Sequence, residues 1–433
     1  MFLFSRKKEV PKLQTTVLDN GLPVVTDSSP QLGGLAVYWN MRSGTRHEKV
    51  EGSLHFLEHM FSSGYQENGM EIHDRFKEIC LEHNFGTGFE NVRAYAHGSI
   101  DDRHEIISSL GNVITAPRWD DGIRETQREL ILNEFREDMN TPSQRCLADS
   151  IVWAYMPHPL GHKILGTEET IRNMQDEHLH DYMRDHFHAQ RMALVVSSPL
   201  RHGEVVKMAR AAFGRIPCGT PAPVQDTPLF HTGHKIHIPG AGPDQRAFLS
   251  YPGIAAGNAD ENPSCIMMGL YQSALDDIIT KQGFSYSGSR CYSATYSDFG
   301  YRVISMSVQD SEKTAEIISR AYDLAMQPDR WLTQKKFDER NRKNKMSKDF
   351  AGAVNPGNRA STISFNFGLT GSIRSYEAVN ADWDRISFDD LCKAYNGWNK
   401  QEFNLLSHGP VDIPTPAEVT GIPTASSSAR PRG

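Results

Sequence analysis

The five residues from His55 to His59 (His-Phe-Leu-Glu-His) constrain the fold of this chain more than any other stretch. Positions i and i+4 of a helix lie one turn apart on the same face, so a helix lets His55 and His59 converge on one metal ion. Glu58 projects beside this pair, where a carboxylate can act as a base toward a metal-activated water. Glycine and serine at 52–53 and 62–64 favour a helix that begins and ends there.

Two histidines alone do not complete a zinc site. A structural zinc ion has four protein ligands, whereas a catalytic one has three and an open position for water. Glu134 is the best candidate for the third ligand. It lies among apolar residues of a predicted helix over 122–138, where burial of an unpaired carboxylate is costly. The alternative is that Glu134 is one more solvated acid in an acid-rich helix.

Two neighbouring segments, Ser43 to Glu48 and Gly52 to Met60, resemble the signature of the pitrilysin/insulinase metallopeptidases, whose H-x-x-E-H motif inverts the common zincin order. Within that family, the chain is most similar to the mitochondrial processing peptidase subgroup. The resemblance runs from about residue 14 to about residue 410. Further matching segments are Asn20-Gly21-Leu22, Pro159-Leu160-Gly161, Ile164 to Thr167, Met192 to Ser197, Gly283 to Tyr286 and Tyr296 to Gly300.

The resemblance implies roles for the residues of the motif. His55, His59 and Glu134 would bind Zn²⁺, and Glu58 would be the catalytic base. The family usually has a second glutamate one helical repeat before the third ligand, and this chain has Gln127 there. We expect Gln127 to support catalysis by a hydrogen bond to a ligand or to water, without the charge of a glutamate.

The resemblance also implies residues that bind an extended substrate. Asn84, Phe85, Gly86 and Thr87 stand where the family has the N-A-x-T entry of a strand that pairs with peptide backbone. The alternative for this segment is a glycine-containing turn that leads into a core strand. Tyr286 corresponds to the tyrosine of the family's G-L-A-Y element and would face the substrate, unless it is a packing residue.

Predicted elements follow one order in each half of the chain. In the first half we expect strands at 13–27 and 34–42, helices at 52–63, 70–82, 101–115 and 122–139, and a loop and strand across 84–97. Helices at 144–155 and 175–187, a strand at 191–197 and a helix at 202–213 follow. The second half restarts with strands at 233–239 and 245–251, a helix at 261–281 and a strand pair across 284–309.

This order predicts an α+β fold with two homologous domains, each an antiparallel-rich sheet covered by helices, around a cleft. Residues 1–216 would form the zinc-bearing catalytic domain, and residues 233–410 a substrate-cleft domain without metal. Residues 217–232 would be the linker, because this segment starts rich in proline and glycine. The segment 411–433, rich in proline, serine and threonine, is predicted to be disordered.

Net charge, apolar stretches and cysteine spacing indicate the cellular compartment and argue against some classes of partner. A net charge of −7 gives no basic surface for nucleic acid. No stretch approaches a membrane span, and the apolar run at the amino terminus is too short for a signal peptide. Six cysteines without C-x-x-C spacing are typical of free thiols in a reducing compartment. We therefore expect a cytoplasmic protein.

The sequence thus favours a zinc metalloendopeptidase that cleaves unfolded peptides with a zinc-activated water. The family resemblance implies an unfolded peptide as substrate and a homodimer or a heterodimer with a homologous chain. The alternative function is a non-catalytic or half-competent subunit of a heterodimeric processing peptidase. Gln127 and Thr280, which replace the family's glutamate and arginine, favour this alternative, whereas the intact ligands favour the enzyme.

Overall fold

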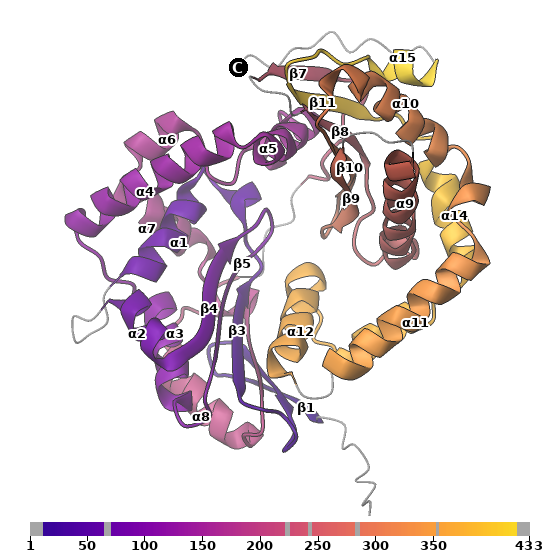
Figure 1. Cartoon of the computed structure of the whole chain (residues 1–433). Coiled ribbons are helices and arrows are strands. Elements are labelled where there is room, and N and C mark those ends of the chain that lie inside the picture. Colours follow the sequence, from indigo (N-terminus) through magenta and orange to yellow (C-terminus); the bar gives the residue numbers. More distant parts are fainter. Residues whose placement is uncertain are drawn as a thin grey trace, which may run out of the picture. The chain divides into compact units, whose positions relative to one another are not determined.

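The computed structural model describes residues 12–64, 71–220, 226–240, 245–281, 286–351 and 355–421 and contains two mixed α+β units (Figure 1). The first unit comprises Met1–Leu132, Ile164–Val224 and Asn344–Ala381. The second unit comprises Asn133–Lys163, Gln225–Lys343 and Asp382–Gly433. The two sheets confirm the predicted fold class. The division into homologous domains at 1–216 and 233–410, and the cleft between them, stay predictions.

The first unit contains a six-stranded sheet in the order β1-β2-β6-β3-β5-β4. Its strands are β1 (Lys12–Val17), β2 (Pro23–Ser28), β3 (Leu35–Met41), β4 (Cys80–Thr87), β5 (Val92–Gly98) and β6 (Met192–Ser198). All neighbouring pairs are antiparallel except β2 with β6. Strands β3 and β6 are mostly apolar and are buried along their whole length, as expected for the centre of the sheet, and β4 lies at an edge.

Helices cover both faces of this sheet (Figure 1). The helices whose residues lie wholly or mainly in this unit are α1 (Ser53–Ser63), α2 (Ile72–Ile79), α3 (Arg103–Thr115), α4 (Asp121–Asn140), α6 (Glu168–Asn173), α7 (Asp176–His186), α8 (His202–Phe213), α12 (Pro356–Thr370) and α13 (Tyr376–Asp384). Side chains alternate along β3, so Trp39 packs toward Phe187 on one face, and Tyr38 packs toward Ile363 of α12 on the other.

Helix α12 belongs to the first unit although it comes from the second half of the sequence. Arg359 of α12 forms a buried ion pair with Asp27 of β2, at 2.6 and 2.9 Å, and Ser197 of β6 donates a hydrogen bond to the same carboxylate. Charges this deeply buried are retained only when they are paired and hydrogen-bonded. The first compact unit thus includes a helix from the second half of the sequence.

The second unit contains a five-stranded sheet in the order β7-β11-β8-β10-β9. Its strands are β7 (Lys235–Pro239), β8 (Gln245–Pro252), β9 (Tyr286–Thr295), β10 (Gly300–Val308) and β11 (Asn404–Gly409). Its helices are α5 (Pro142–Tyr155), α9 (Glu261–Lys281), α10 (Thr314–Ala325), α11 (Gln334–Ala351, shared with the first unit), α14 (Phe388–Trp398) and α15 (Pro416–Thr420). Short 3₁₀ turns in the two units span Thr45–His47, Pro159–Gly161, Ala189–Arg191, Ser311–Lys313 and Pro328–Arg330.

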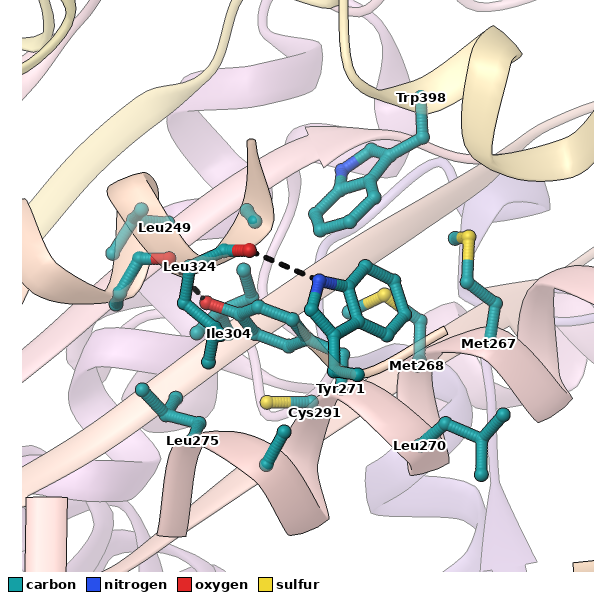
Figure 2. Packing of buried hydrophobic residues seen from close by; sticks show 14 of the residues in the cluster. Leu249, Met267, Met268, Leu270, Tyr271, Leu275, Cys291, Ile304, Leu324 and Trp398 are labelled. Carbon is teal, nitrogen blue, oxygen red and sulfur yellow. Dashed lines mark hydrogen bonds between the residues drawn. The ribbon is translucent and has the colours of Figure 1, made fainter. Parts of the chain in front are cut away.

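Figure 2 shows the core of the second unit, where Tyr271 of α9 lies among side chains from β8, β10, α10 and α14. Its hydroxyl donates a hydrogen bond of 2.7 Å to the carbonyl of Ala321. The indole N–H of Trp331 likewise donates to the carbonyl of Leu324, at 2.9 Å. Tyr271 and Trp331 are therefore both buried with their polar atom satisfied.

Two local predictions are wrong in part. The helix expected over 70–82 ends at Ile79, because residues 80–87 pair with β5 as strand β4. The predicted disordered tail includes residues 411–421, yet Ile413 is 3% exposed in the core of the second unit and α15 follows it. Residues 422–433 lie outside the described residues. Strand β11 was not predicted, and it lies between β7 and β8.

Candidate metal centre

Helix α1 carries the motif and has a fixed beginning. Gly52 precedes it with φ 85°, and a Cβ atom there would lie 2.6 Å from the carbonyl oxygen of Leu165, so the position requires glycine. The carboxylate of Glu48 accepts hydrogen bonds from the backbone N–H groups of Gly52, at 2.9 Å, and Leu54, at 2.6 Å. These bonds satisfy N–H groups that a helix leaves unpaired at its start, directly before His55.

The Glu48 carboxyl group itself is buried. Burial raises its pKa to about 8, although the two backbone N–H groups act in the opposite direction. Sequence reasoning did not assign Glu48 a role. The available signal was an acid a few residues before a predicted helix start, where negative charge is favourable.

The structure brings His55, His59 and Glu134 together. One donor atom from each residue lies within 4.8 Å of the other two. Two imidazoles and a carboxylate form the ligand set of many catalytic zinc sites, and donor atoms this close can share one ion at distances of about 2.0–2.2 Å. Within the part of the chain that the structure describes, no other group of three such residues has this geometry. The residues present therefore fit zinc.

Glu134 reaches this group from α4 and is partly exposed. Its predicted surroundings were apolar, but the neighbouring Leu130 is 49% exposed. The side of α4 near Glu134 is therefore only partly buried. Burial of an unpaired carboxylate is therefore not the reason for its position. Glu134 is a candidate ligand because its carboxylate lies close to the two histidines.

Gln127 lies two helical turns before Glu134 and is 7% exposed. Its Oε1 atom is 3.0 Å from Nδ1 of His59. An amide oxygen only accepts hydrogen bonds, so this contact places the ring proton on Nδ1 and leaves Nε2 of His59 unprotonated, as a metal ligand must be. The expected hydrogen bond from Gln127 to a ligand residue is therefore present, and its contribution to catalysis stays a prediction.

Arg128 holds α4 in place. Its guanidinium group donates hydrogen bonds to the carbonyls of Ile171, at 2.5 Å, and Met174, at 2.8 Å, near the end of α6. It also lies 5.5 Å from the ring centre of Phe56 in α1, a cation–π contact. One buried arginine thus connects the two helices that carry the metal-binding residues, a role that the charge pattern of α4 did not reveal.

Glu58 is partly buried on α1 and contacts the end of β4. The hydroxyl group of Thr87 donates a hydrogen bond of 2.6 Å to Oε2 of Glu58. Thr87 was predicted to bind substrate as part of the segment from Asn84. Its side chain instead contacts the predicted base, so its substrate role stays a prediction.

A cavity of about 810 Å³ in the first unit adjoins this group. Glu58, His59 and Gln127 line it together with Asn84 and Phe85 of β4. In the structure, the segment from Asn84 forms the end of edge strand β4 and not a turn. The alternative prediction for this segment is therefore wrong. Gly86 continues the same strand.

The predicted substrate residue of the second half cannot be placed in a site. Strand β9 begins at Tyr286, but the side chain of Tyr286 and all of residues 283–285 lie outside the described residues. Thr280, at the end of α9, is exposed. The role of Tyr286 stays a prediction.

Sequence comparison gives one family match and several relatives. Residues 173–340 match the family described as "Peptidase M16 inactive domain", a region that follows Glu134 and excludes the candidate metal centre. The β subunit of the mitochondrial-processing peptidase of Blastocladiella emersonii is 30% identical over 310 residues, which cover 67% of this chain and 66% of that protein. The probable β subunit of Schizosaccharomyces pombe is 30% identical over 211 residues, 48% of this chain and 46% of that protein. The matched region thus spans less than two thirds of these relatives.

Solved structures share the fold. A protease from Helicobacter pylori superimposes with a TM-score of 0.79 at 14% identity, covering 93% of this chain and 100% of that one. A "peptidase M16 inactive domain" from Pseudomonas fluorescens gives a TM-score of 0.78 at 16% identity, covering 93% and 99%. Identities this low speak for the fold alone. The family match and the sequence relatives show that this chain belongs to the pitrilysin/insulinase (M16) family of peptidases, in the subgroup of the mitochondrial processing peptidases.

Proposed function

We propose that this chain is a zinc metalloendopeptidase that cleaves unfolded peptides. The observation that carries this proposal is the convergence of donor atoms from His55, His59 and Glu134 within 4.8 Å. Glu58 lies next to His59 in the sequence and lines the same cavity. Membership of a peptidase family supports peptide-bond hydrolysis as the reaction.

The chain's own residues would divide the chemistry among them. Zinc bound by His55, His59 and Glu134 would polarise the scissile carbonyl and lower the pKa of water to about 7. Glu58 would take a proton from the attacking water and deliver it to the leaving amine. Thr87 would hold one oxygen of the Glu58 carboxylate, and Gln127 would hold His59 in the tautomer that binds metal.

Strand β4 supports an extended peptide as substrate. In the described sheet β4 pairs only with β5, so its other edge presents backbone N–H and C=O groups. A peptide that adds to such an edge is held by main-chain hydrogen bonds and is accepted with many side chains. Asn84 and Phe85 lie on this strand and in the wall of the cavity that contains Glu58. Unfolded peptides satisfy this requirement, whereas folded proteins do not.

A second candidate function is a half-competent subunit that depends on a homologous chain. Gln127 supports it, because an uncharged amide occupies the place next to His59. The relatives from Blastocladiella emersonii and Saccharomyces cerevisiae are named β subunits of a mitochondrial-processing peptidase. A homodimer or a heterodimer with a homologous chain is part of this proposal. A cytoplasmic location is proposed separately, from the six scattered cysteines. No helix in the described residues is long and apolar enough to cross a membrane.

One experiment decides between the two candidates. The purified chain is analysed for zinc and tested on a quenched, unstructured peptide, before and after chelation and after zinc is restored. We expect hydrolysis that the chelator abolishes and zinc restores, with the Glu58→Gln variant inactive throughout. Zinc binding without hydrolysis, followed by hydrolysis when a homologous chain is added, would support the second candidate. Hydrolysis by the metal-free chain would overturn the first.

A further inference from the structure

We propose that the second unit contains a binding site for a peptide carboxylate, formed by Arg246 and Arg290. The proposal rests on the proposed function, because a peptide substrate is what brings the carboxylate. Neither arginine belongs to the candidate metal centre. The site would recognise an acidic side chain or the free carboxyl terminus of a peptide.

The two arginines project from the same face of the second sheet. Arg246 of β8 pairs with Ser307 of β10, and Arg290 of β9 pairs with Ser305 of β10. Since Ser305 and Ser307 are two residues apart on one strand, their pairing partners share a face. The opposite face carries Ile304, which is buried in the core of the second unit.

This face is hollowed. A cavity of about 650 Å³ is lined by both arginines, by Tyr292 and Ser305 of the sheet and by Gln144 of α5. Among the described residues, no acidic side chain lines it. Strand spacing places the two arginine Cα atoms about 12 Å apart, across one intervening strand, so their long side chains can approach one carboxylate from two sides.

Within the part of the chain that the structure describes, neither guanidinium group has an ion-pair or side-chain hydrogen-bond partner. The nearby Asp276 instead accepts hydrogen bonds from the backbone N–H of Ser289, at 3.1 Å, and its hydroxyl, at 2.7 Å. By contrast, Arg302 on the core face of β10 donates to the carbonyl of Pro252, at 2.7 Å.

A carboxylate matches this arrangement chemically. Guanidinium groups bind carboxylates through paired, charge-assisted hydrogen bonds that are shorter and stronger than neutral ones. Two such groups in a cavity whose described lining has no acidic residue leave positive charge that an anion would neutralise. Hydroxyl and amide groups of the lining, such as those of Ser305 and Gln144, can donate further hydrogen bonds to the same oxygens.

The test measures binding of short fluorescent peptides to the full chain in the presence of a chelator, so that cleavage does not interfere. The probe is an unstructured peptide with glutamates and a free carboxyl terminus. A second peptide has an amidated terminus, and a third has glutamine in place of glutamate. We expect Arg246→Ala/Arg290→Ala to raise the dissociation constant of the first peptide about tenfold or more. If the amidated peptide does not bind, the site recognises the carboxyl terminus. If the glutamine peptide does not bind, the site recognises the glutamate side chain.

Matched controls distinguish a specific carboxylate site from a general effect of positive surface charge. Arg330→Ala/Arg342→Ala removes two exposed positive charges from the same unit and should leave binding within about twofold of wild type. Arg246→Lys/Arg290→Lys keeps the charge without the guanidinium fork and should bind with intermediate affinity. The lysine variant also replaces the alanine variant if thermal melting shows that the latter is unfolded.

Three results would overturn the proposal. These are no binding of the glutamate peptide to wild type, equal binding by the alanine double variant, and an equal loss in the Arg330/Arg342 control. Failure of the proposed peptidase function would be recognised separately, as absence of chelator-sensitive hydrolysis. The binding measurement is made without zinc and does not depend on that outcome.

Discussion

The hydroxyl group of Thr87 donates a hydrogen bond of 2.6 Å to Oε2 of Glu58, and so joins the end of edge strand β4 to helix α1. The segment from Thr45 to Glu48, just before α1, contacts both the end of β4 and the start of α1. The backbone N–H of Thr45 bonds the carbonyl of Gly88, next to Thr87, at 3.0 Å. Glu48, three residues later, bonds the first turn of α1. The position of the predicted base relative to edge strand β4 is therefore set by one short stretch of chain.

Thr87→Val tests this bond, because valine has nearly the same shape and lacks the hydroxyl group. We expect kcat for peptide hydrolysis to fall about tenfold with little change in KM, since the Glu58 carboxylate loses an orienting hydrogen bond. Zinc content and thermal stability should not change, and Thr87→Ser should restore kcat. A change in KM alone would instead support the original prediction that Thr87 contacts the substrate.

The metal ligands are tested by single alanine substitutions. His55→Ala, His59→Ala and Glu134→Ala should each remove most of the zinc, because a catalytic site has only three protein ligands. Metal analysis of the purified variants gives the stoichiometry, which should be about one ion per chain in the wild type. Glu137→Ala, at an exposed position on the same helix, is the matched control. Full zinc retention by Glu134→Ala would exclude that residue from the ligand set.

Glu58→Gln tests whether Glu58 acts in peptide hydrolysis without binding zinc. Glutamine is nearly isosteric with glutamate, and Glu58 is not a proposed ligand, so the variant should keep its zinc. Peptide hydrolysis should nevertheless fall roughly 10²–10⁴-fold, the usual contribution of a general acid–base group. Near-normal turnover, or loss of zinc, would contradict the assignment of Glu58 as the base.

Substitutions of Gln127 test whether the chain hydrolyses peptides efficiently without a partner chain. We expect slow hydrolysis of short peptides by the isolated wild type, and faster hydrolysis by Gln127→Glu, because a carboxylate would strengthen the orientation and basicity of His59. Gln127→Leu removes the hydrogen bond to His59 and should weaken zinc affinity by about 10–100-fold. Fast turnover by the wild type, unchanged in Gln127→Glu, would show that the chain does not depend on a partner.

Stability should fall in acid because the surroundings of His47 and His186 disfavour the protonation of both side chains. Nδ1 of His186 is 2.9 Å from the guanidinium group of Arg191, which can only donate a hydrogen bond, so Nδ1 accepts and carries no proton. Burial, followed by the charge of Arg191, lowers the pKa of His186 to about 4. Burial, followed by the proximity of His186, likewise lowers the pKa of His47 to about 4.

The unfolded chain takes up these protons near pH 6.5, so the stability from neutral His47 and His186 is complete above that pH. It is lost as pH falls toward 4. Urea unfolding between pH 7 and pH 4 should show a smaller loss for His186→Asn than for wild type. His104→Asn, at an exposed position, should behave like wild type. An equal loss in all three proteins would show that other groups control acid stability.

The sequence by itself determined the local elements of the site. Apolar periodicity and flanking glycines predicted a helix at 52–63, and the structure has α1 at Ser53–Ser63. The same reasoning predicted a helix at 122–139, where α4 spans Asp121–Asn140. Within each helix, the spacing of residues fixes which side chains share a face. The pairing of His55 with His59, and of Gln127 with Glu134, follows from that spacing alone.

Only the tertiary structure decided which elements meet. Residues 80–82 fit a helix locally and became strand because β5 supplies pairing partners. Helix α12 packs on the first sheet, where Arg359 forms an ion pair with Asp27, a residue far away in the sequence. The hydrogen bonds of Thr87 to Glu58 and of Gln127 to His59 also arise between separate elements. A local pattern specifies the period of an element and its apolar face, whereas strand partners and buried ion pairs depend on residues that the pattern does not contain.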